Sequence, residues 1–254
     1  RGAAAEAAPA SPAPERFAAE PLRAGLVELR AGASRVRVAP DAGIAEWSVD
    51  EAPVLRGPYP SAAPFASLAA RRTGLWCTRL ADRDHPDQGV EWADDRDALE
   101  YADAATGAGI APGGWTLAPG DDDGLVVRAD AGEGPRDGAA PAAPVETAIH
   151  FVPDAGTAAE IVVEVLGRRW RLDPGGAWRG AVDAAAVVLR DGRALVAEPV
   201  GERAELFVRS TAAGPLVTAL GRGPLELRLR VVASRALAER ALAGRRARAG
   251  EGER

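Results

Sequence analysis

The sequence is poor in the residues that build metal centres and disulfides. Its 254 residues include one cysteine (Cys77), two histidines and no methionine, and neither lysine nor asparagine occurs in the chain. A single cysteine excludes an intramolecular disulfide and a cysteine-only metal site, and two histidines far apart in the sequence do not make a convincing zinc site. The cysteine usage mildly favours a cytoplasmic location, although a secreted protein whose signal peptide has been removed would fit the same composition.

A basic surface and a long apolar run are missing as well. The formal net charge is −6, and arginine supplies every side-chain cation other than a protonated histidine. Because nucleic-acid binding requires a basic face, this charge argues against that class of partner. No run of about 20 apolar residues occurs, so we expect no transmembrane span and no membrane partner. The sequence also lacks a phosphate-binding P-loop, a dinucleotide fingerprint and a nucleophile elbow, and we predict no cofactor.

Short apolar segments with strand-like alternation are abundant. Between residues 225 and 231, leucine or valine at odd positions alternates with charged residues at even positions, which is the period of a strand with one buried face. Numerous short strands with turn signals between them predict an all-β protein, an antiparallel β-sandwich. Strands are expected at residues 26–29, 35–38, 44–49, 54–55, 125–128, 145–152, 160–166, 168–172, 185–190, 194–198, 204–209, 216–220 and 225–232.

Turn chemistry supports these boundaries. Asp191-Gly192 lies between two apolar runs and is the clearest hairpin signal in the chain, because both residues tolerate the positive φ angles of tight hairpin turns. Asp50-Glu51 predicts a second tight reversal. The acidic run at residues 121–124 lacks the alternating spacing and distal glutamate of a common calcium loop, so we interpret it as a solvated turn.

Composition divides the chain into three parts. Residues 1–20 are rich in alanine and proline and predict a disordered leader or linker. Residues 21–234 contain the expected strands and form the sandwich domain, and residues 235–254 predict an arginine- and alanine-rich helix or tail. Within the sandwich, residues 57–144 are irregular and carry a dense acidic segment, where residues 93–101 are expected to form a short helix.

Three side chains are candidates for acid–base chemistry. His85 lies in an acidic loop, where neighbouring carboxylates favour its protonated form, and His150 lies on an expected strand. Glu198 ends a strand and is followed by a proline, a suitable place for a general base. Each residue also has a plain structural interpretation: a surface histidine, a histidine hydrogen-bonded within a partly buried layer, and a strand-end glutamate.

Tryptophan is the main aromatic residue and a candidate for sugar binding, because indole faces stack on the C–H patches of sugar rings. Trp92, Trp115 and Trp178 fall in or near loops and could bind a sugar, whereas Trp47 and Trp170 lie within strands and are expected in the core. Arg72, in the pair at residues 71–72, could hold an anionic or hydroxyl-rich ligand.

The N-terminal segment resembles a known family. Residues 36–50 read Val-Arg-Val-Ala-Pro-Asp-Ala-Gly-Ile-Ala-Glu-Trp-Ser-Val-Asp, and Pro-Val-Leu-Arg follows at residues 53–56. This pattern resembles the start of aldose 1-epimerase (galactose mutarotase-like) proteins, which have a strand, a Pro-x-x-Gly-Gly turn, a second strand and a short hairpin. The Tyr-Pro-Ser-Ala-Ala-Pro-Phe stretch at residues 59–65 looks like the proline-containing segment that follows in that family.

The resemblance implies a large antiparallel super-sandwich and a cofactor-free isomerase that interconverts sugar anomers. In such proteins a histidine acts as general acid on the ring oxygen and a glutamate as base on the anomeric hydroxyl. By this resemblance His85 and His150 would be the family's two histidines, and Glu198 its base. The substrate or partner would be a sugar or a polysaccharide.

Two alternatives remain open. His150 is followed by Phe-Val-Pro, where the family has Pro-Tyr-Phe, and this difference favours a non-catalytic carbohydrate-binding or structural β-sandwich module. Such a module would present a shallow face lined by tryptophan without a carboxylate–histidine pair. The sandwich domain of a polysaccharide lyase is the other alternative, and it would present an arginine-lined groove.

Overall fold

The architecture comes from a computed structural model that describes residues 18–21, 27–39, 43–57, 74–80, 90–92, 99–101, 115–129, 146–156, 158–173, 178, 182–211 and 214–249. The strands are β1 (Ala18–Pro21), β2 (Val27–Ala31), β3 (Ser34–Ala39), β4 (Gly43–Val49), β5 (Ala52–Pro53), β6 (Leu75–Leu80), β7 (Val90–Trp92), β8 (Leu99–Tyr101), β9 (Trp115–Pro119), β10 (Leu125–Ala129), β11 (Glu146–Phe151), β12 (Ile161–Val165), β13 (Arg168–Leu172), β14 (Ala184–Val188), β15 (Ala194–Thr211) and β16 (Gly214–Val232). One helix, α1 (Arg235–Ala249), follows the last of these strands. Among the helical residues described here, none belongs to a helix long and apolar enough to cross a lipid bilayer.

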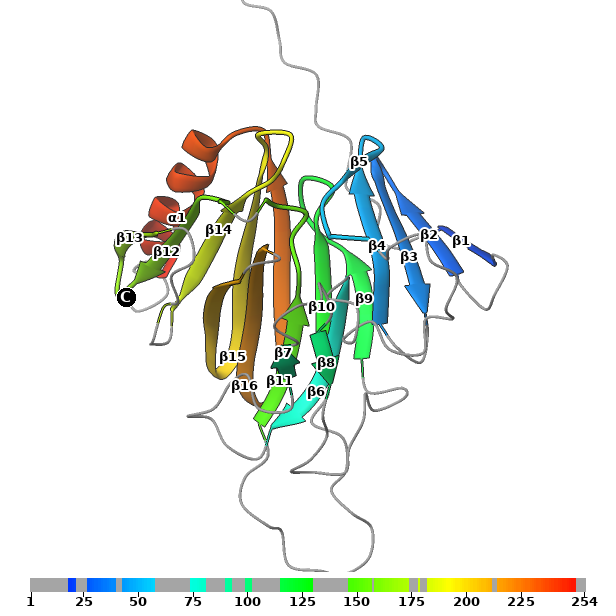
Figure 1. Cartoon of the computed structure of the whole chain (residues 1–254), viewed down its shortest axis with the longest axis horizontal. Helices are drawn as coiled ribbons and strands as arrows, with labels where there is room; N and C mark the ends of the chain where they lie inside the picture. The colour runs from blue at the N-terminus through cyan, green and yellow to red at the C-terminus, as the bar shows by residue number, and fades with distance from the viewer. Residues whose placement is uncertain are drawn as a thin grey trace, which may run out of the picture.

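Antiparallel pairing joins most of these strands into one network, in the order β1-β2-β3-β4-β6-β11-β16-β15-β14-β12-β13. A branch adds β10 to β16 and β9 to β10, and β7 pairs with β8 in a separate ladder. Figure 1 places β1 to β5 on one side of the molecule and β12 to β14 with α1 on the other. The chain is therefore an all-β antiparallel sandwich, and the predicted fold class is confirmed.

The long hairpin of β15 and β16 connects two arms of this network. One arm runs from β1 to β11 with β9 and β10, and the other contains β14, β12 and β13. One edge of β16 pairs with β11 along residues 217–222 and with β10 along residues 225–229. The pairing of β15 with β16 shifts register between Val200 and Glu202 and again between Glu202 and Glu205. Such irregularities bend a strand without ending it. Four predicted strands, at residues 194–198, 204–209, 216–220 and 225–232, are therefore two continuous strands.

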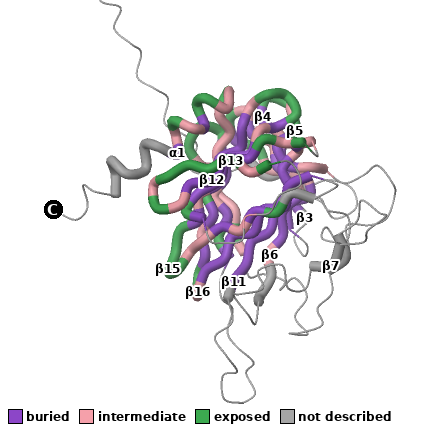
Figure 2. The backbone as a smooth tube through the Cα atoms, turned by 60° about the vertical axis from the view of Figure 1, so that its left-hand side comes forward, coloured by how far each residue is buried: buried purple, intermediate pink, exposed green. Residues whose placement is uncertain are grey.

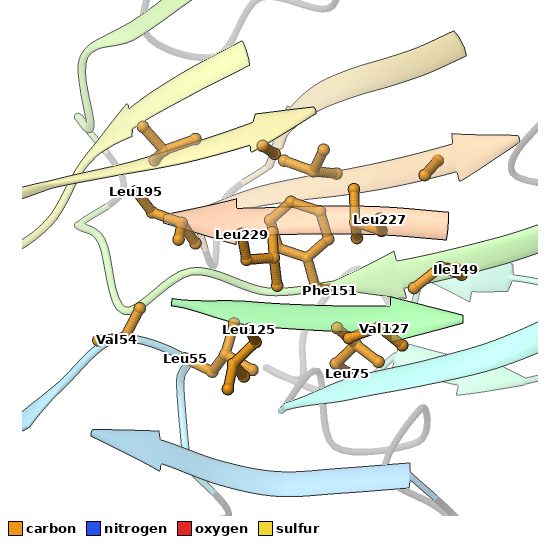
Figure 3. Close-up of a cluster of buried hydrophobic side chains, with 14 of the residues drawn as sticks. Val54, Leu55, Leu75, Leu125, Val127, Ile149, Phe151, Leu195, Leu227 and Leu229 are labelled. Atoms are coloured by element: carbon orange, nitrogen blue, oxygen red, sulfur yellow. The ribbon is translucent and has the colours of Figure 1, made fainter. Parts of the chain in front are cut away.

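The core lies between the inward faces of the two arms. Alternate residues of β10 and β16 point inward: Leu125 and Val127 are fully buried, as is Leu227. Phe151 and Ile149 of β11 join the same cluster, and Figure 3 draws these side chains pointing toward one another. Burial of each large apolar side chain stabilises the fold by about 1.5–3 kcal/mol, so the period-2 pattern determines which face of each strand is covered.

Helix α1 covers part of the outer face of the sandwich. Ala238 and Leu242 are buried against a small cluster from β12, β14 and β15. Ser234 precedes the helix, and its hydroxyl accepts a hydrogen bond from the Leu237 N–H over 3.4 Å, as an N-cap residue does. The sequence predicted either a helix or a tail for residues 235–254, and the structure contains helix α1 there. Figure 2 shows buried stretches concentrated in the strands and exposed stretches at the turns.

The tight turns follow the predicted chemistry. Asp50 and Glu51 have φ angles of 52° and 63° between β4 and β5, and Gly192 has a φ of 87° between β14 and β15. The acidic segment before β10 forms a turn in which the Gly124 N–H donates to the Asp121 carbonyl over 2.9 Å. These three predictions are confirmed.

Several elements differ from the sequence-based expectation. Residues 99–101 belong to strand β8, which pairs with β7, and not to the predicted helix at residues 93–101; the rest of that segment lies mostly outside the described residues. Strands β6 and β9 were not predicted. Strand β1 covers Ala18–Pro21, at the end of the segment expected to be a leader. A strand at a sheet edge or next to a polar loop lacks the strong alternation that marks a central strand.

Candidate functional site

The structure describes only some of the residues that the sequence suggested as a site. His85 and Arg72 lie outside the described residues. Trp92 is the last residue of β7, and only its backbone is described. The comparison of prediction and structure therefore concerns His150, Glu198 and the tryptophans of the other strands.

His150 is sealed from solvent on the face of β11 opposite to the core. Its side chain points away from the faces of Ile149 and Phe151, as the alternation predicted, and it is fully buried. The Nδ1 atom lies 2.9 Å from the hydroxyl oxygen of Thr218, and the ring stacks on Trp76 with centroids 5.3 Å apart and planes inclined by 20°. Burial lowers the pKa of His150 to about 3, so the imidazole is neutral near pH 7. A neutral ring without solvent access is placed to support packing and not to protonate a sugar.

Glu198 and His150 lie beside distant parts of β16, the strand with which both β15 and β11 pair. Glu198 pairs in register with Arg228 of β16, whereas His150 pairs with Thr218 of the same strand. Ten positions separate these two partners, which corresponds to roughly 30 Å in a fully extended strand. The Glu198 carboxylate instead lies 3.7 Å from the Arg230 guanidinium. The structure therefore does not bring the proposed acid and base together, because proton transfer requires hydrogen-bonding distances.

Cys77 is not available as a nucleophile. It is a free thiol on β6, paired in register with Ile149 of β11. Burial raises the pKa of the thiol to about 12, so the reactive thiolate is scarce near neutral pH.

Two tryptophans lie in contact at β13, the last strand of the pairing order. The Trp170 ring on β13 lies 6.1 Å from the Trp178 ring, at an interplanar angle of 44°. Trp178 packs partly against the main core, and its backbone N–H donates to the Val208 carbonyl of β15 over 3.1 Å. The Trp170 side chain is 49% exposed. One indole therefore packs against the other, and about half of its surface remains exposed to solvent.

The strand that carries Trp170 is an edge strand rich in arginine. Within the described part of the chain, β13 pairs with β12 alone. Three arginines flank the tryptophan at residues 168, 169 and 171, and all three are exposed. Charged residues on an edge strand discourage unwanted strand pairing, and they also provide cations for a ligand.

These arginines divide between the two faces of β13. Arg169 donates to the Glu239 carbonyl of α1 over 2.9 Å, and the Arg171 guanidinium lies 3.6 Å from the Glu239 carboxylate. Both therefore point toward the helix. Arg168 shares the face of Trp170, since residues two apart along a strand point the same way, and it forms no ion pair with another described residue. The Trp170 face thus carries an uncommitted guanidinium beside an exposed indole.

The hairpin before β13 is held in a constrained turn. Leu166 and Gly167 have φ angles of 49° and 72°, and the Leu166 N–H donates to an Asp183 carboxylate oxygen over 2.7 Å. The Leu166 side chain is 80% exposed. A leucine in the left-handed region is unfavourable, and here its side chain also gains little from burial.

Sequence reasoning identified only part of this surface. Trp178 was predicted as a binding residue, and the structure places it beneath the exposed ring of Trp170. Trp170 itself was expected in the core, and this was wrong because an edge strand has only one neighbour to cover it. The signal that could have found it is the Arg-Arg-Trp-Arg run of residues 168–171, where charges interrupt the alternation that a two-sided strand requires. Trp47, in contrast, is 1% exposed and belongs to the core as predicted.

Trp115 does not take part in this surface. It is half-buried at the start of β9, opposite Ala129 of β10, and packs against the main core. Among the tryptophans whose side chains are described, Trp170 has the largest exposed fraction.

Comparisons with known proteins leave the family of this chain open. No family model matches the sequence, and no curated protein matches it. The crystal structure of the Slr1438 protein from Synechocystis sp. PCC 6803 is similar over 84% of this chain and 96% of that chain, with 12% sequence identity and a TM-score of 0.40. A likeness at this level does not support an assignment of function.

Proposed function

We propose that this chain is a non-catalytic β-sandwich module that binds an acidic carbohydrate at the edge of the sheet. The single observation that carries the proposal is the half-exposed Trp170 ring, held against Trp178 and sharing its face with Arg168. A sugar ring would stack on the indole face, and a carboxylate on the sugar would accept hydrogen bonds from the guanidinium.

The placement of the suggested acid–base residues supports a binding role over anomer interconversion. His150 is buried and neutral, and Glu198 of β15 lies beside Arg230 of β16, in a part of that strand distant from the partner of His150. A binding module needs neither residue to reach a ligand. It needs a rigid aromatic surface, and Trp178 supplies the support that keeps Trp170 in place.

Calorimetric titration with two oligosaccharides of equal length tests this proposal. The first contains only glucuronate or galacturonate units, and the second contains the matching neutral sugars. We expect the acidic oligosaccharide to bind, the neutral one to bind more weakly, and Trp170→Ala to weaken binding about tenfold, because a lost stacking contact costs on the order of 1 kcal/mol or more.

Matched arginine variants separate the role of Arg168 from general charge. Arg168→Gln should weaken binding of the acidic oligosaccharide but not of the neutral one, whereas Arg169→Gln, on the opposite face, should leave both unchanged. Thermal unfolding of each variant checks that the fold is intact. The proposal fails if neither oligosaccharide binds, or if Trp170→Ala and Arg168→Gln bind as the unmodified protein does.

A further inference from the structure

A second candidate site lies on the outer face of β3 and β4, separate from the tryptophan surface. A pocket of about 300 Å³ opens there beside the β4–β5 turn. This volume is at the lower end of the range for ligand pockets, so it suits a small molecule. The pocket is lined by Arg35, Arg37, Glu46, Trp47, Ser48, Glu51, Pro53, Leu55 and Gly57.

One of the two arginines in the pocket is already neutralised. The Arg37 Nε donates to Glu28 over 3.2 Å, and its Nη1 donates to Glu46 over 2.8 Å. Glu28 is only 3% exposed and also accepts a hydrogen bond from Arg30 over 2.6 Å. Burial alone would raise the pKa of Glu28, but the hydrogen bonds from Arg30 and Arg37 lower it overall. Glu28 is therefore ionised and holds Arg37 in place as part of the pocket floor.

The other arginine keeps its hydrogen-bond donors available. The Arg35 guanidinium lies 3.8 Å from Glu28 and 3.9 Å from Glu51, and both distances exceed that of a hydrogen bond. The Arg35 side chain is 38% exposed, and that of Glu51 is 86% exposed. The pocket thus presents one cation and one carboxylate side by side, neither of them committed to a short contact with the other.

The backbone of Glu51 has a defined place although its side chain is exposed. This residue forms the β4–β5 turn together with Asp50, with both φ angles in the left-handed region. The turn is fastened to the turn that precedes β3, because the Asp50 N–H donates to the Ala33 carbonyl over 3.1 Å. The backbone of Glu51 is therefore fixed relative to Arg35, and only its side chain has to adjust to a ligand.

From this arrangement we infer that the pocket binds a small zwitterion of the α-amino-acid type. The ligand carboxylate accepts hydrogen bonds from Arg35, and the ligand ammonium donates to Glu51. A short apolar side chain of the ligand packs against Pro53, which lines the pocket and is exposed. A zwitterion fits better than a simple anion because the two uncommitted groups of the pocket carry opposite charges, and electrostatic complementarity selects a ligand that matches both.

Titrations followed by nuclear magnetic resonance, observing the Gly57 amide, test this inference. The probes are L-leucine, isocaproate, which lacks the ammonium group, and isoamylamine, which lacks the carboxylate. We expect a saturable shift with L-leucine, and binding at least about tenfold weaker for the other two probes, since each loses one charge-assisted contact.

Two arginine variants provide the matched comparison. Arg35→Gln should reduce the affinity for L-leucine about tenfold or more, whereas Arg30→Gln, which contacts the same Glu28 from outside the pocket, should leave it within about twofold. Equal losses in both variants would overturn the inference, as would a lack of saturable shifts with L-leucine. Equal binding of isocaproate and L-leucine would also overturn it, because the pocket would then be a simple anion site.

Discussion

At the scale of single residues, the environment of His150 has a measurable consequence. Burial lowers its pKa to about 3 in the folded chain, whereas a histidine in an unfolded chain titrates near pH 6.5. As the pH falls below about 6.5, His150 binds a proton in the unfolded chain but stays neutral in the folded chain. The stability associated with neutral His150 is therefore complete above this pH and is lost progressively as the pH falls toward 3.

The variant His150→Phe should remove this pH dependence. Between pH 7 and pH 5, we expect the free energy of unfolding of the unmodified protein to fall by about 2 kcal/mol more than that of the variant, since each pH unit in this window costs up to about 1.4 kcal/mol. Denaturant unfolding at the two pH values measures the difference.

Thr218→Val is the control for this experiment. It removes the hydroxyl that lies 2.9 Å from His150 but keeps the buried imidazole. Its stability should be lower at every pH, with the pH dependence retained. A steep pH dependence in His150→Phe, equal to that of the unmodified protein, would mean that another group is responsible.

At the scale of secondary-structure elements, the β12–β13 hairpin is locally unfavourable. Its turn places Leu166 in the left-handed region with the side chain 80% exposed. Hairpins of this kind prefer asparagine or glycine at such positions. A leucine here carries a cost in stability, and it lies in the same hairpin as Trp170, the centre of the proposed carbohydrate surface.

Replacement of Leu166 with asparagine should therefore stabilise the fold. We expect Leu166→Asn to raise the free energy of unfolding by about 1 kcal/mol, because asparagine tolerates a positive φ and exposes less apolar area. Denaturant unfolding measures this change, and Leu237→Asn on α1 is the comparison. Leu237 is 39% exposed and lies in a helix, so its replacement should lower stability by up to about 0.7 kcal/mol. A destabilised Leu166→Asn would show that the leucine makes contacts that outweigh the backbone cost.

At the scale of the whole molecule, the two arms share one hairpin and one core. Because one edge of β16 pairs with β11 and β10, and its other edge pairs with β15, which in turn pairs with β14, neither arm can lose its pairing without affecting the other. The core cluster draws residues from both arms, from Val36 of β3 to Val163 of β12. We therefore expect the arms to unfold together.

Leu227→Ala tests this cooperativity at the shared strand. Leu227 is fully buried in the core, so its truncation should lower the free energy of unfolding by about 2–5 kcal/mol. Tryptophan fluorescence and far-ultraviolet circular dichroism should nonetheless report one coincident transition. Leu237→Ala, at an exposed helix position, should change stability by less than about 1 kcal/mol. Two separate transitions in Leu227→Ala would contradict a single cooperative unit.

The comparison between sequence and structure differs from element to element. Central strands such as β4 and β11 were predicted closely, because their alternation reflects one covered face. The hairpin of β15 and β16 was read as four strands, because its bulges carry the same glycine and proline signals as turns. For the proposed pocket, the sequence indicated only that Arg35 and Arg37 lie on the solvent-facing side of a strand. It could not show that Glu46 and Glu51 lie beside them, since these residues come from a neighbouring strand and turn.

The sequence alone determined the fold class, most strand positions and the tight turns, because these depend on residues close together in the chain. Only the tertiary structure decided that His150 is sealed from solvent, that Glu198 of β15 pairs with a part of β16 distant from the partner of His150, and that Trp170 is exposed. These properties depend on which strand lies next to which and on which strand ends the order. That information comes from long-range pairing, and a local pattern of apolar and polar residues does not contain it.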